Sequence, residues 1–250
     1  MPDFAKKWVY AGITTTFDAP TTAMVEQWDE DEFRQNIPTE SNAEGREWQG
    51  EAVPDVRIVT IPIYLEGGTR QQLRDRWEAV ACALAQPAEG TWYMHSDRYV
   101  TGRVNMIRKD LDEGMNFLRA TIGLRCADPY WYKNSLTTAT LTGGGNSVTI
   151  EGGNRPVPVF TFDTTGAGDL TVTHDGRSFV LAITDNAQYV IDCGTGTVTQ
   201  GGVDALALMT GEFIEEGLRV GATTIGVTLG GTLALSSGSV SYRPRWAHTA

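Results

Sequence analysis

Alternating apolar and polar residues, with little helical spacing, dominate the second half of the chain. Eight runs rich in β-branched and aromatic residues span 147–151, 157–165, 169–174, 178–184, 188–193, 197–200, 223–229 and 239–243. Glycines separate most of these runs, and Asp175-Gly176 has the residue types of a tight hairpin turn. Helical spacing is indicated only around 204–209. The pattern predicts an antiparallel β-sandwich.

The first half contains one segment with clear helical spacing, residues 69–85. Thr69 and Gln72 have the spacing of a capping box at its start, and Pro87 ends it. The apolar positions recur three and four residues apart: Leu73, Trp77, Val80, Ala81 and Leu84. We therefore expect a helix that packs one face on a sheet.

Strand-like runs surround this predicted helix. They cover Trp8-Val9-Tyr10 and residues 56–65, 91–94, 99–109 and 116–126. The last two are separated by the polar turn 110–114, which predicts a long β-hairpin. Pro62 lies inside one run and indicates an edge position or a bulge, because proline donates no hydrogen bond. Residues 29–53 are acidic and predict an extended surface loop with short strands.

Composition divides the chain near residue 133. Residues 1–133 hold all four lysines and six of the seven tryptophans, whereas 134–250 hold 19 of the 28 glycines. We predict two mainly β domains, 1–133 and 147–250, joined by a Thr/Ser/Gly-rich linker over 134–146 that could pair briefly as a strand.

The net charge of −11 argues against wrapping DNA or docking on anionic lipid, since both need basic surfaces. No apolar run approaches the roughly 18 residues that span a bilayer, and no signal peptide is evident, so we expect a soluble, unexported protein with no membrane partner. Cys82, Cys126 and Cys193 are too far apart for zinc pairs and odd in number, which predicts buried free thiols.

Motifs that carry catalytic chemistry are missing from the sequence: it has no phosphate loop, nucleophile elbow, His-Glu-x-x-His or Cys-x-x-Cys pattern. His95, His174 and His248 are far apart in sequence, which favours satisfied or solvated histidines. The acidic groups at 29–32 and 110–113 are typical of solvated loops, and Phe160 and Phe162 alternate as on a core face. We expect no enzyme activity, no cofactor and no metal site.

Four segments, taken in order, resemble one known family. They are 98–104 (RYVTGRV), 126–132 (CADPYWY), 153–160 (GNRPVPVF) and 240–246 (VSYRPRW). With the helix between strands, they resemble the distal tail proteins of long-tailed (siphovirus-type) bacteriophages, along about the whole chain. The residues that carry this resemblance are Arg98, Tyr99, Gly102, Arg103, Asp128, Pro129, Tyr130, Trp131, Tyr132, Pro156, Pro158, Tyr242, Pro244 and Trp246.

Ordinary physical roles account for several of these residues. Asp128-Pro129 starts a turn, and the three aromatic residues after it could cover the junction of the two domains. Pro156 and Pro158 favour an extended entry into the second domain. The stretch 242–246 would form a closing edge strand that ends at Pro244.

The resemblance implies an architectural function. The first domain, a β-sandwich with one helix and a long β-hairpin, would form a ring, a hexamer in this family, that continues the tail tube, and the second would be a galectin-like β-sandwich. Partners would be the tail tube protein, the tape-measure protein and hub or receptor-binding proteins of the tip, with DNA passing through the channel without specific binding. Such a subunit would be assembled in the host cytoplasm and reside in the virion tail tip.

Two other classes of function stay open from the residues alone. A galectin-like domain could be the carbohydrate-binding module of a surface adhesion protein, which glycan binding through an exposed aromatic residue would support. A glycosidase would need a pair of carboxylates across a cleft, and the sequence does not define such a pair.

Overall fold

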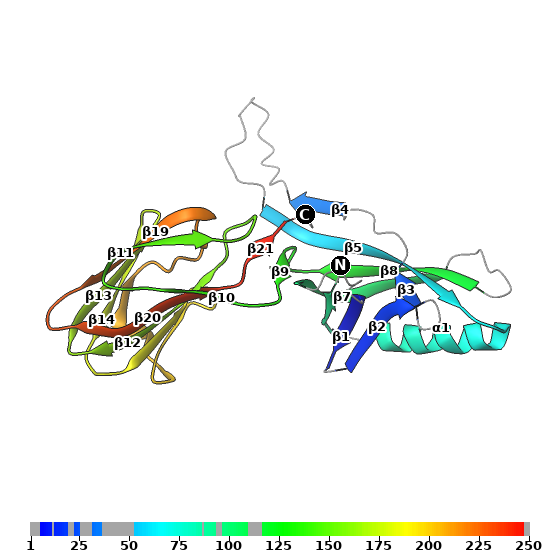
Figure 1. Ribbon diagram of the computed structural model, residues 1–250, viewed down its shortest axis with the longest axis horizontal. Coiled ribbons are helices and arrows are strands. Elements are labelled where there is room, and N and C mark those ends of the chain that lie inside the picture. The colour runs from blue at the N-terminus through cyan, green and yellow to red at the C-terminus, as the bar shows by residue number, and fades with distance from the viewer. Residues whose placement is uncertain are drawn as a thin grey trace, which may run out of the picture. The chain divides into compact units, whose positions relative to one another are not determined.

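The computed structural model describes residues 6–11, 13–19, 23–25, 32–36, 53–86, 88–93, 97–109 and 117–247. The chain forms two compact units, unit 1 (Met1–Trp131, with His248–Ala250) and unit 2 (Tyr132–Ala247). Strands account for most of the described residues, and α1 (Arg70–Leu84) is the one α-helix among them (Figure 1). The predicted mainly β fold is confirmed.

The strands of unit 1 pair in a closed circuit. They are β1 (Lys6–Tyr10), β2 (Ile13–Ala19), β3 (Ala23–Val25), β4 (Glu32–Asn36), β5 (Val53–Glu66), β6 (Gly90–Tyr93), β7 (Arg98–Lys109) and β8 (Phe117–Cys126). Antiparallel pairing runs from β7 through β6, β1, β2, β3, β5 and β8 back to β7. β4 pairs with β5 beside this circuit, and β9 (Trp131–Lys133) lies next to β7. The predicted hairpin of β7 and β8 is present, and its turn lies outside the described residues.

The circuit encloses the core of unit 1. Trp8 and Trp92 lie directly opposite each other on β1 and β6, and both are buried. On β5 and β8 alternate residues point inward: Val59, Ile61, Ile63, Leu65, Leu118, Ala120, Ile122 and Leu124. The helix α1 adds Leu73, Val80 and Leu84 to the same core. Its first turn is capped as predicted, because the Thr69 hydroxyl accepts a hydrogen bond from the Gln72 N–H.

Pro62 occupies a position where its missing donor is tolerated. β5 is an interior strand, paired with β8 along residues 57–66. On its other side β4 pairs with residues 53–58 and β3 with 63–64. Among the described strands, β8 is therefore the one neighbour of residues 59–62. The predicted edge character is thus confined to this short stretch of an interior strand.

Unit 2 is a sandwich of two antiparallel sheets (Figure 1). One sheet has the order β10 (Thr137–Thr140), β20 (Ala234–Tyr242), β12 (Pro158–Thr165), β15 (Gln188–Asp192), β16 (Thr197–Gln200), β17 (Val203–Asp204). The other has the order β11 (Gly144–Ile150), β19 (Gly221–Leu229), β13 (Gly168–His174), β14 (Arg177–Ile183), β18 (Met209–Gly211). The elements η1 (Leu206–Leu208, a 3-10 turn) and β21 (Arg245–Trp246) complete the unit.

The core of unit 2 follows the predicted alternation. Phe160 and Phe162 on β12 are fully buried, and Phe160 meets Phe179 of the facing sheet edge-on at 5.7 Å between ring centroids. Asp175 and Gly176 both have positive φ, 51° and 81°, and connect β13 to β14 directly. The predicted hairpin and core face are therefore confirmed.

The structure revises three details of the sequence prediction. The stretch 134–146 was predicted as a linker that could pair briefly as a strand: 137–140 do pair with β20, and because Leu141 is buried in the core, the stretch belongs to the sandwich. β20 is an interior strand that ends at Tyr242, whereas β21 (Arg245–Trp246) lies at the end of the strand order β21-β9-β7, so the closing edge strand predicted for 242–246 is confined to its last two residues. The helical spacing around 204–209 produces a single 3-10 turn, because β17 and β18 occupy its two ends.

His174 is a satisfied core histidine, as predicted. Its Nε2 accepts a hydrogen bond from the Arg219 backbone N–H at 3.0 Å, and its Nδ1 lies 3.2 Å from the Thr224 carbonyl. Each ring nitrogen thus has a backbone partner, which requires the neutral ring protonated on Nδ1. His95 and His248 lie outside the described residues. No helix in the described part of the chain is long and apolar enough to cross a membrane.

The three free thiols are expected to differ in reactivity. Cys126 and Cys193 are buried as predicted, whereas Cys82 is exposed on α1. Burial raises the pKa of Cys193 to about 11, so its reactive thiolate form is scarce at pH 8. Titration of the native protein with a thiol reagent at pH 8 should therefore give one fast equivalent, and unfolding in guanidinium should release two more. Two fast equivalents in the native state would contradict this burial.

Candidate interaction surface

The outward face of the sheet formed by β5, β8 and β7 is the candidate site. Residues of these strands alternate between the core and this face, and the pairing register fixes which side chains are neighbours. We define the outward face by Ile58, Thr60, Pro62, Tyr64 and Glu66 of β5, Phe117, Arg119, Thr121, Gly123 and Arg125 of β8, and Arg103, Asn105, Met106 and Arg108 of β7.

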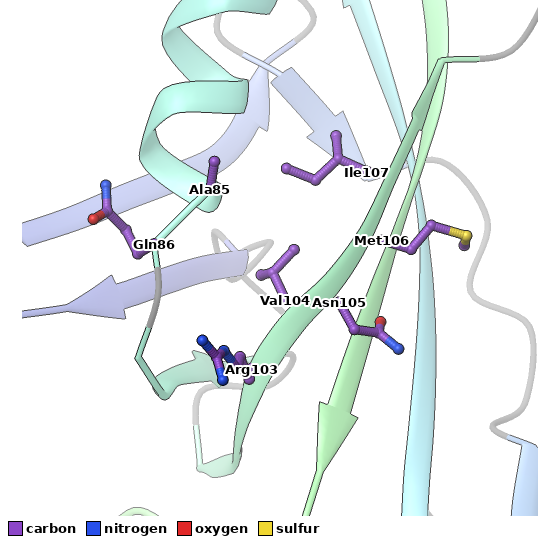
Figure 2. Close-up of a pocket in the computed structure, with 7 residues that line it drawn as sticks. All are labelled: Ala85, Gln86, Arg103, Val104, Asn105, Met106 and Ile107. Atoms are coloured by element: carbon purple, nitrogen blue, oxygen red, sulfur yellow. The ribbon is translucent and has the colours of Figure 1, made fainter.

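A β-bulge shapes the middle of the outward face. The register of β7 against β8 shifts between Val104 and Met106, so Asn105 is the inserted residue. A Cβ on Gly123 would lie 2.8 Å from the Asn105 side-chain oxygen and 3.1 Å from the Met106 Cβ. Glycine at 123 thus leaves room for both side chains. Figure 2 shows Asn105 and Met106 on one side of β7, opposite Val104 and Ile107.

Arginine supplies most of the charge on the outward face. Arg103 and Arg125 are exposed and lie directly opposite each other on β7 and β8. The side chain of neither forms a hydrogen bond or ion pair within the described residues. Arg108 and Arg119 are also exposed, and Glu66 is the one acidic residue of this face as defined. Like charges directly across a strand pair repel, so the intrinsic stability of the sheet does not explain this arrangement.

Apolar and aromatic side chains complete the outward face. Met106 keeps 42% of its surface exposed and Phe117 keeps 36%. The Phe117 ring stacks on Tyr64 with 6.0 Å between centroids, and the Tyr64 hydroxyl donates to Glu66. Arginine, methionine and aromatic residues are enriched at protein–protein interfaces.

A shallow pocket lies beside β7, toward the end of α1 (Figure 2). Its lining comes from Ala85, Gln86, Arg103, Val104, Asn105, Met106 and Ile107. Val104 and Ile107 point to the helix side of β7, where the Gln86 amide donates to the Cys82 carbonyl. No cluster of metal-ligating side chains occurs among the described residues, and this pocket holds no carboxylate.

The first family segment lies in β7, where Gly102 has a packing role. It is buried, and a Cβ there would lie 2.8 Å from both the Arg125 carbonyl oxygen and the Cys126 sulfur. Only glycine therefore allows β7 this close to the end of β8. Arg98 lies 3.9 Å from Asp97, and the Tyr99 ring meets Tyr93 at 5.6 Å.

Replacing Gly102 by alanine should destabilise unit 1. The added methyl must displace backbone or buried atoms, which costs about 1 to 3 kcal/mol of unfolding free energy. Gly68→Ala is the matched control, since the nearest atom there is the flexible end of Gln72. Urea unfolding followed by tryptophan fluorescence measures both variants, and equal effects would refute the proposed role of Gly102.

The second family segment packs around a buried arginine. The Asp128 carboxylate accepts a hydrogen bond from the Tyr130 N–H at 3.2 Å, which forms the expected turn. Pro129 and Trp131 are buried, and the guanidinium of the fully buried Arg57 lies 5.8 Å from the Trp131 ring. Such a geometry permits a cation–π interaction.

The third and fourth family segments meet within unit 2. The Gly153 and Asn154 N–H groups donate to the Arg245 carbonyl, and the Asn154 side chain accepts from the Ala247 N–H. The ring of Trp246 covers Gly153, where a Cβ would approach it to 3.0 Å. These contacts join residues that are 91 to 93 positions apart in sequence, so they fix residues 245–247 on the sandwich.

The residues that directly follow the second segment join the same cluster. The Lys133 N–H donates to the Pro244 carbonyl at 2.9 Å, and the Arg243 guanidinium donates to the Lys133 and Asn134 carbonyls. Tyr132 is half-buried at this place in unit 2. The third and fourth family segments, together with the residues that directly follow the second, therefore form one hydrogen-bonded cluster.

Tyr242, Pro156 and Pro158 are buried structural residues. The Tyr242 hydroxyl donates to the Thr149 carbonyl and accepts from the Glu151 N–H, and burial raises its pKa above the ordinary value. The Pro156 carbonyl accepts from Leu218 and the Pro158 carbonyl from Cys193. These contacts tie the start of β12 to the loops beside it.

Sequence reasoning missed the outward face and Arg57. Alternate residues of β8 read Phe117, Arg119, Thr121, Gly123 and Arg125, which was a usable signal for one basic face. The bulge at Asn105 shifts the alternation in β7, so Arg103 and Arg108 do not follow one simple period. The alternation of apolar and polar residues cannot identify a buried arginine such as Arg57, because charged residues normally lie on the exposed face of a strand.

Comparisons with known proteins support the fold. The structure is similar to the Dit protein (gp 19.1) of SPP1, described as a paradigm of the hub adsorption apparatus in phages that infect Gram-positive bacteria. The TM-score is 0.72 with 14% identity, and the match covers 97% of this chain and 99% of that one. The chain therefore shares a mainly β fold with SPP1 Dit along nearly its whole length.

Other comparisons add less. A chain of the phage p2 baseplate, in its activated conformation with Sr, is similar at a TM-score of 0.42 with 9% identity, covering 96% of this chain and 97% of that one. A score at this level has no weight for the fold. No protein-family model matches the sequence, and no curated protein matches it either.

Proposed function

We propose that this chain is a distal tail protein, a non-enzymatic structural subunit of a phage tail tip. The observation that carries the proposal is the fold shared with SPP1 Dit over 97% of the chain. The four family segments support it independently, because they are recognised from sequence. In the virion the chain would form a ring, with six copies as the family resemblance implies, between the tail tube and the tip.

The proposed partners follow from this position. Unit 1 would contact neighbouring copies of the chain and the tail tube protein, and the tape-measure protein would meet the ring. Hub or receptor-binding proteins would attach at the tip side, and DNA would pass through the centre without specific contacts. Unit 2, as a galectin-like sandwich, would be an architectural appendage. The burial of Phe160 and Phe162 in its core supports this role over that of a sugar-stacking platform.

Images of the purified chain test this proposal. Negative-stain electron microscopy, with and without the tail tube protein, should show rings with six-fold symmetry that cap tube ends. A chain that stays monomeric at all concentrations and never associates with tubes would contradict the proposal. Specific binding on a glycan array, lost on substitution of an exposed aromatic residue, would favour an adhesion module instead.

A further inference from the structure

The segment that connects β18 to β19 in unit 2, residues 212–219 (EFIEEGLR), contains no helix or strand. We call it the strap. Ile214 and Leu218 are its buried anchors in the core. The Leu218 N–H donates to the Pro156 carbonyl at 2.8 Å, which ties this end of the strap to the segment before β12. Further contacts of the strap, with His174 and Arg177, depend on protonation.

His174 on β13 accepts a hydrogen bond from the last residue of the strap. Its Nε2 lies 3.0 Å from the Arg219 backbone nitrogen, and its Nδ1 donates to the Thr224 carbonyl of β19. A ring that is protonated on both nitrogens has two donors and no acceptor, so it cannot accept from Arg219. His174 is also only 2% exposed, and a charge at such a buried position is costly. Closure of this end of the strap therefore requires the neutral ring.

Two carboxylates of the strap bind one arginine beside His174. Arg177 lies directly opposite His174 in the pairing of β13 with β14. Its guanidinium donates to Glu212 at 2.9 Å and also to Glu216. Both glutamates are mostly exposed, so each ion pair adds only a little stability. Protonation of either carboxylate removes the negative charge on which its ion pair depends.

Acid weakens all of these contacts in the same direction. Protonation of His174 removes an acceptor and places a positive charge on the cross-strand neighbour of Arg177, while protonation of the glutamates releases Arg177. The other charged residues on the segments around His174 and the strap are Arg155, Asp175, Asp192, Glu215 and Arg219. Asp175 is already paired with Arg155 at 2.9 Å, so it compensates a charge on His174 only weakly. The strand β19 contains no charged residue.

We propose that the strap is a pH-sensitive latch, closed on the sandwich at neutral pH and opened when His174 takes up a proton. This inference concerns unit 2 alone and goes beyond the proposed architectural role. Histidine ordinarily changes its charge between about pH 5 and 8, and carboxylates titrate at lower pH, so His174 should act first as the pH falls. Gly211 and Gly221 flank the strap with φ of +97° and +91°, so backbone freedom is available at both of its ends.

Hydrogen exchange of the full chain at about pH 7.5 and about pH 5.5 tests the latch. We expect the protection of the backbone amides of 217–220 to fall by about 10-fold at the lower pH, after correction for the intrinsic pH dependence of exchange. This change corresponds to the loss of one hydrogen bond to a buried group. Peptides from β12 serve as the internal reference and should not change. A strap that is equally protected at both pH values would overturn the proposal.

His174→Gln supplies an amide that offers a donor and an acceptor at every pH. It should keep the strap protected at about pH 7.5 and abolish the loss of protection at about pH 5.5. His95→Gln removes a histidine of unit 1 as the matched control, and it should retain the full acid effect. E212Q/E216Q should lower protection at both pH values and also retain that effect. An acid effect that persists in His174→Gln, or that is abolished by E212Q/E216Q, contradicts the role of His174.

A measurement on the wild-type chain keeps the test independent of whether His174→Gln folds. The chain has three histidines, so the imidazole NMR signals of protein made with isotope-labelled histidine are few enough to resolve. The His174 signal should show the neutral form protonated on Nδ1 at about pH 7.5, and it should change to the doubly protonated form in step with exchange of the Arg219 amide. A ring that is doubly protonated while the strap stays closed, or a strap that opens while the ring stays neutral, would refute the latch.

Discussion

Gly168→Ala is expected to unfold unit 2 under conditions where unit 1 stays folded. Gly168 has φ of +148°, a region that essentially only glycine occupies, and a Cβ would lie 2.0 Å from the Gly230 carbonyl oxygen. The cost of the backbone strain and the cost of the overlap with backbone atoms add together. We therefore expect the unfolding free energy of unit 2 to fall by about 4 kcal/mol or more. Hydrogen exchange of unit 2 peptides should rise strongly.

Gly176→Ala separates strain from overlap in the same hairpin. Gly176 has φ of +81°, but no atom lies within 4 Å of the position that an added methyl group would take. The substitution should therefore lower the unfolding free energy only by the cost of placing alanine in the left-handed conformation, about 1 kcal/mol. Tryptophan fluorescence reports on unit 1 in both variants, since Trp246 is the one tryptophan of unit 2. If the two substitutions lowered the unfolding free energy of unit 2 by similar amounts, the close approach of Gly168 to Gly230 would be contradicted.

Trp131→Ala is expected to have the largest effect in unit 1. The substitution removes a fully buried indole and opens a cavity beside the buried Arg57 guanidinium. Large-to-small substitutions of this kind lower the unfolding free energy by about 3 to 5 kcal/mol. The loss of the aromatic face beside the Arg57 guanidinium lowers it further. Unfolding in guanidinium, followed by circular dichroism, should show two transitions, and the transition of unit 1 should occur at a lower guanidinium concentration than in the wild-type protein.

Trp131→Phe is the corresponding control. Phenylalanine keeps an aromatic face toward Arg57 and fills most of the space, so a loss of about 1 to 2 kcal/mol is expected. If the Trp131→Ala and Trp131→Phe variants had equal unfolding free energies, the aromatic side chain would not stabilise the buried Arg57.

The sequence predicts most elements for local physical reasons. The capped helix, the strands of unit 2 and the Asp175-Gly176 hairpin each follow from spacing or turn residues within a short window. The pairing of strand β10 is not predicted, because its Thr-rich sequence has little apolar alternation. Its partner, β20, lies about 100 residues later in the sequence. Register and partner choice are long-range properties that local patterns do not encode.

The candidate surface illustrates the same limit. Asn105 adds one residue to β7 without any sequence signal, so the face of Arg103 and Met106 becomes clear only from their pairing with Arg125 and Gly123. Gly102 is identified by the family resemblance, whereas its physical reason, close approach to the Arg125 carbonyl, requires the structure. The contact between the third and fourth family segments is likewise visible only in the folded chain.

Immunogold labelling of intact virions, with antibodies against this chain, tests the central claim most directly. The measurement uses particles from a host that carries the gene, imaged by electron microscopy. The account predicts gold at the end of the tail farthest from the capsid, on a ring of this protein. Virions without label, or label confined to the capsid, would contradict it.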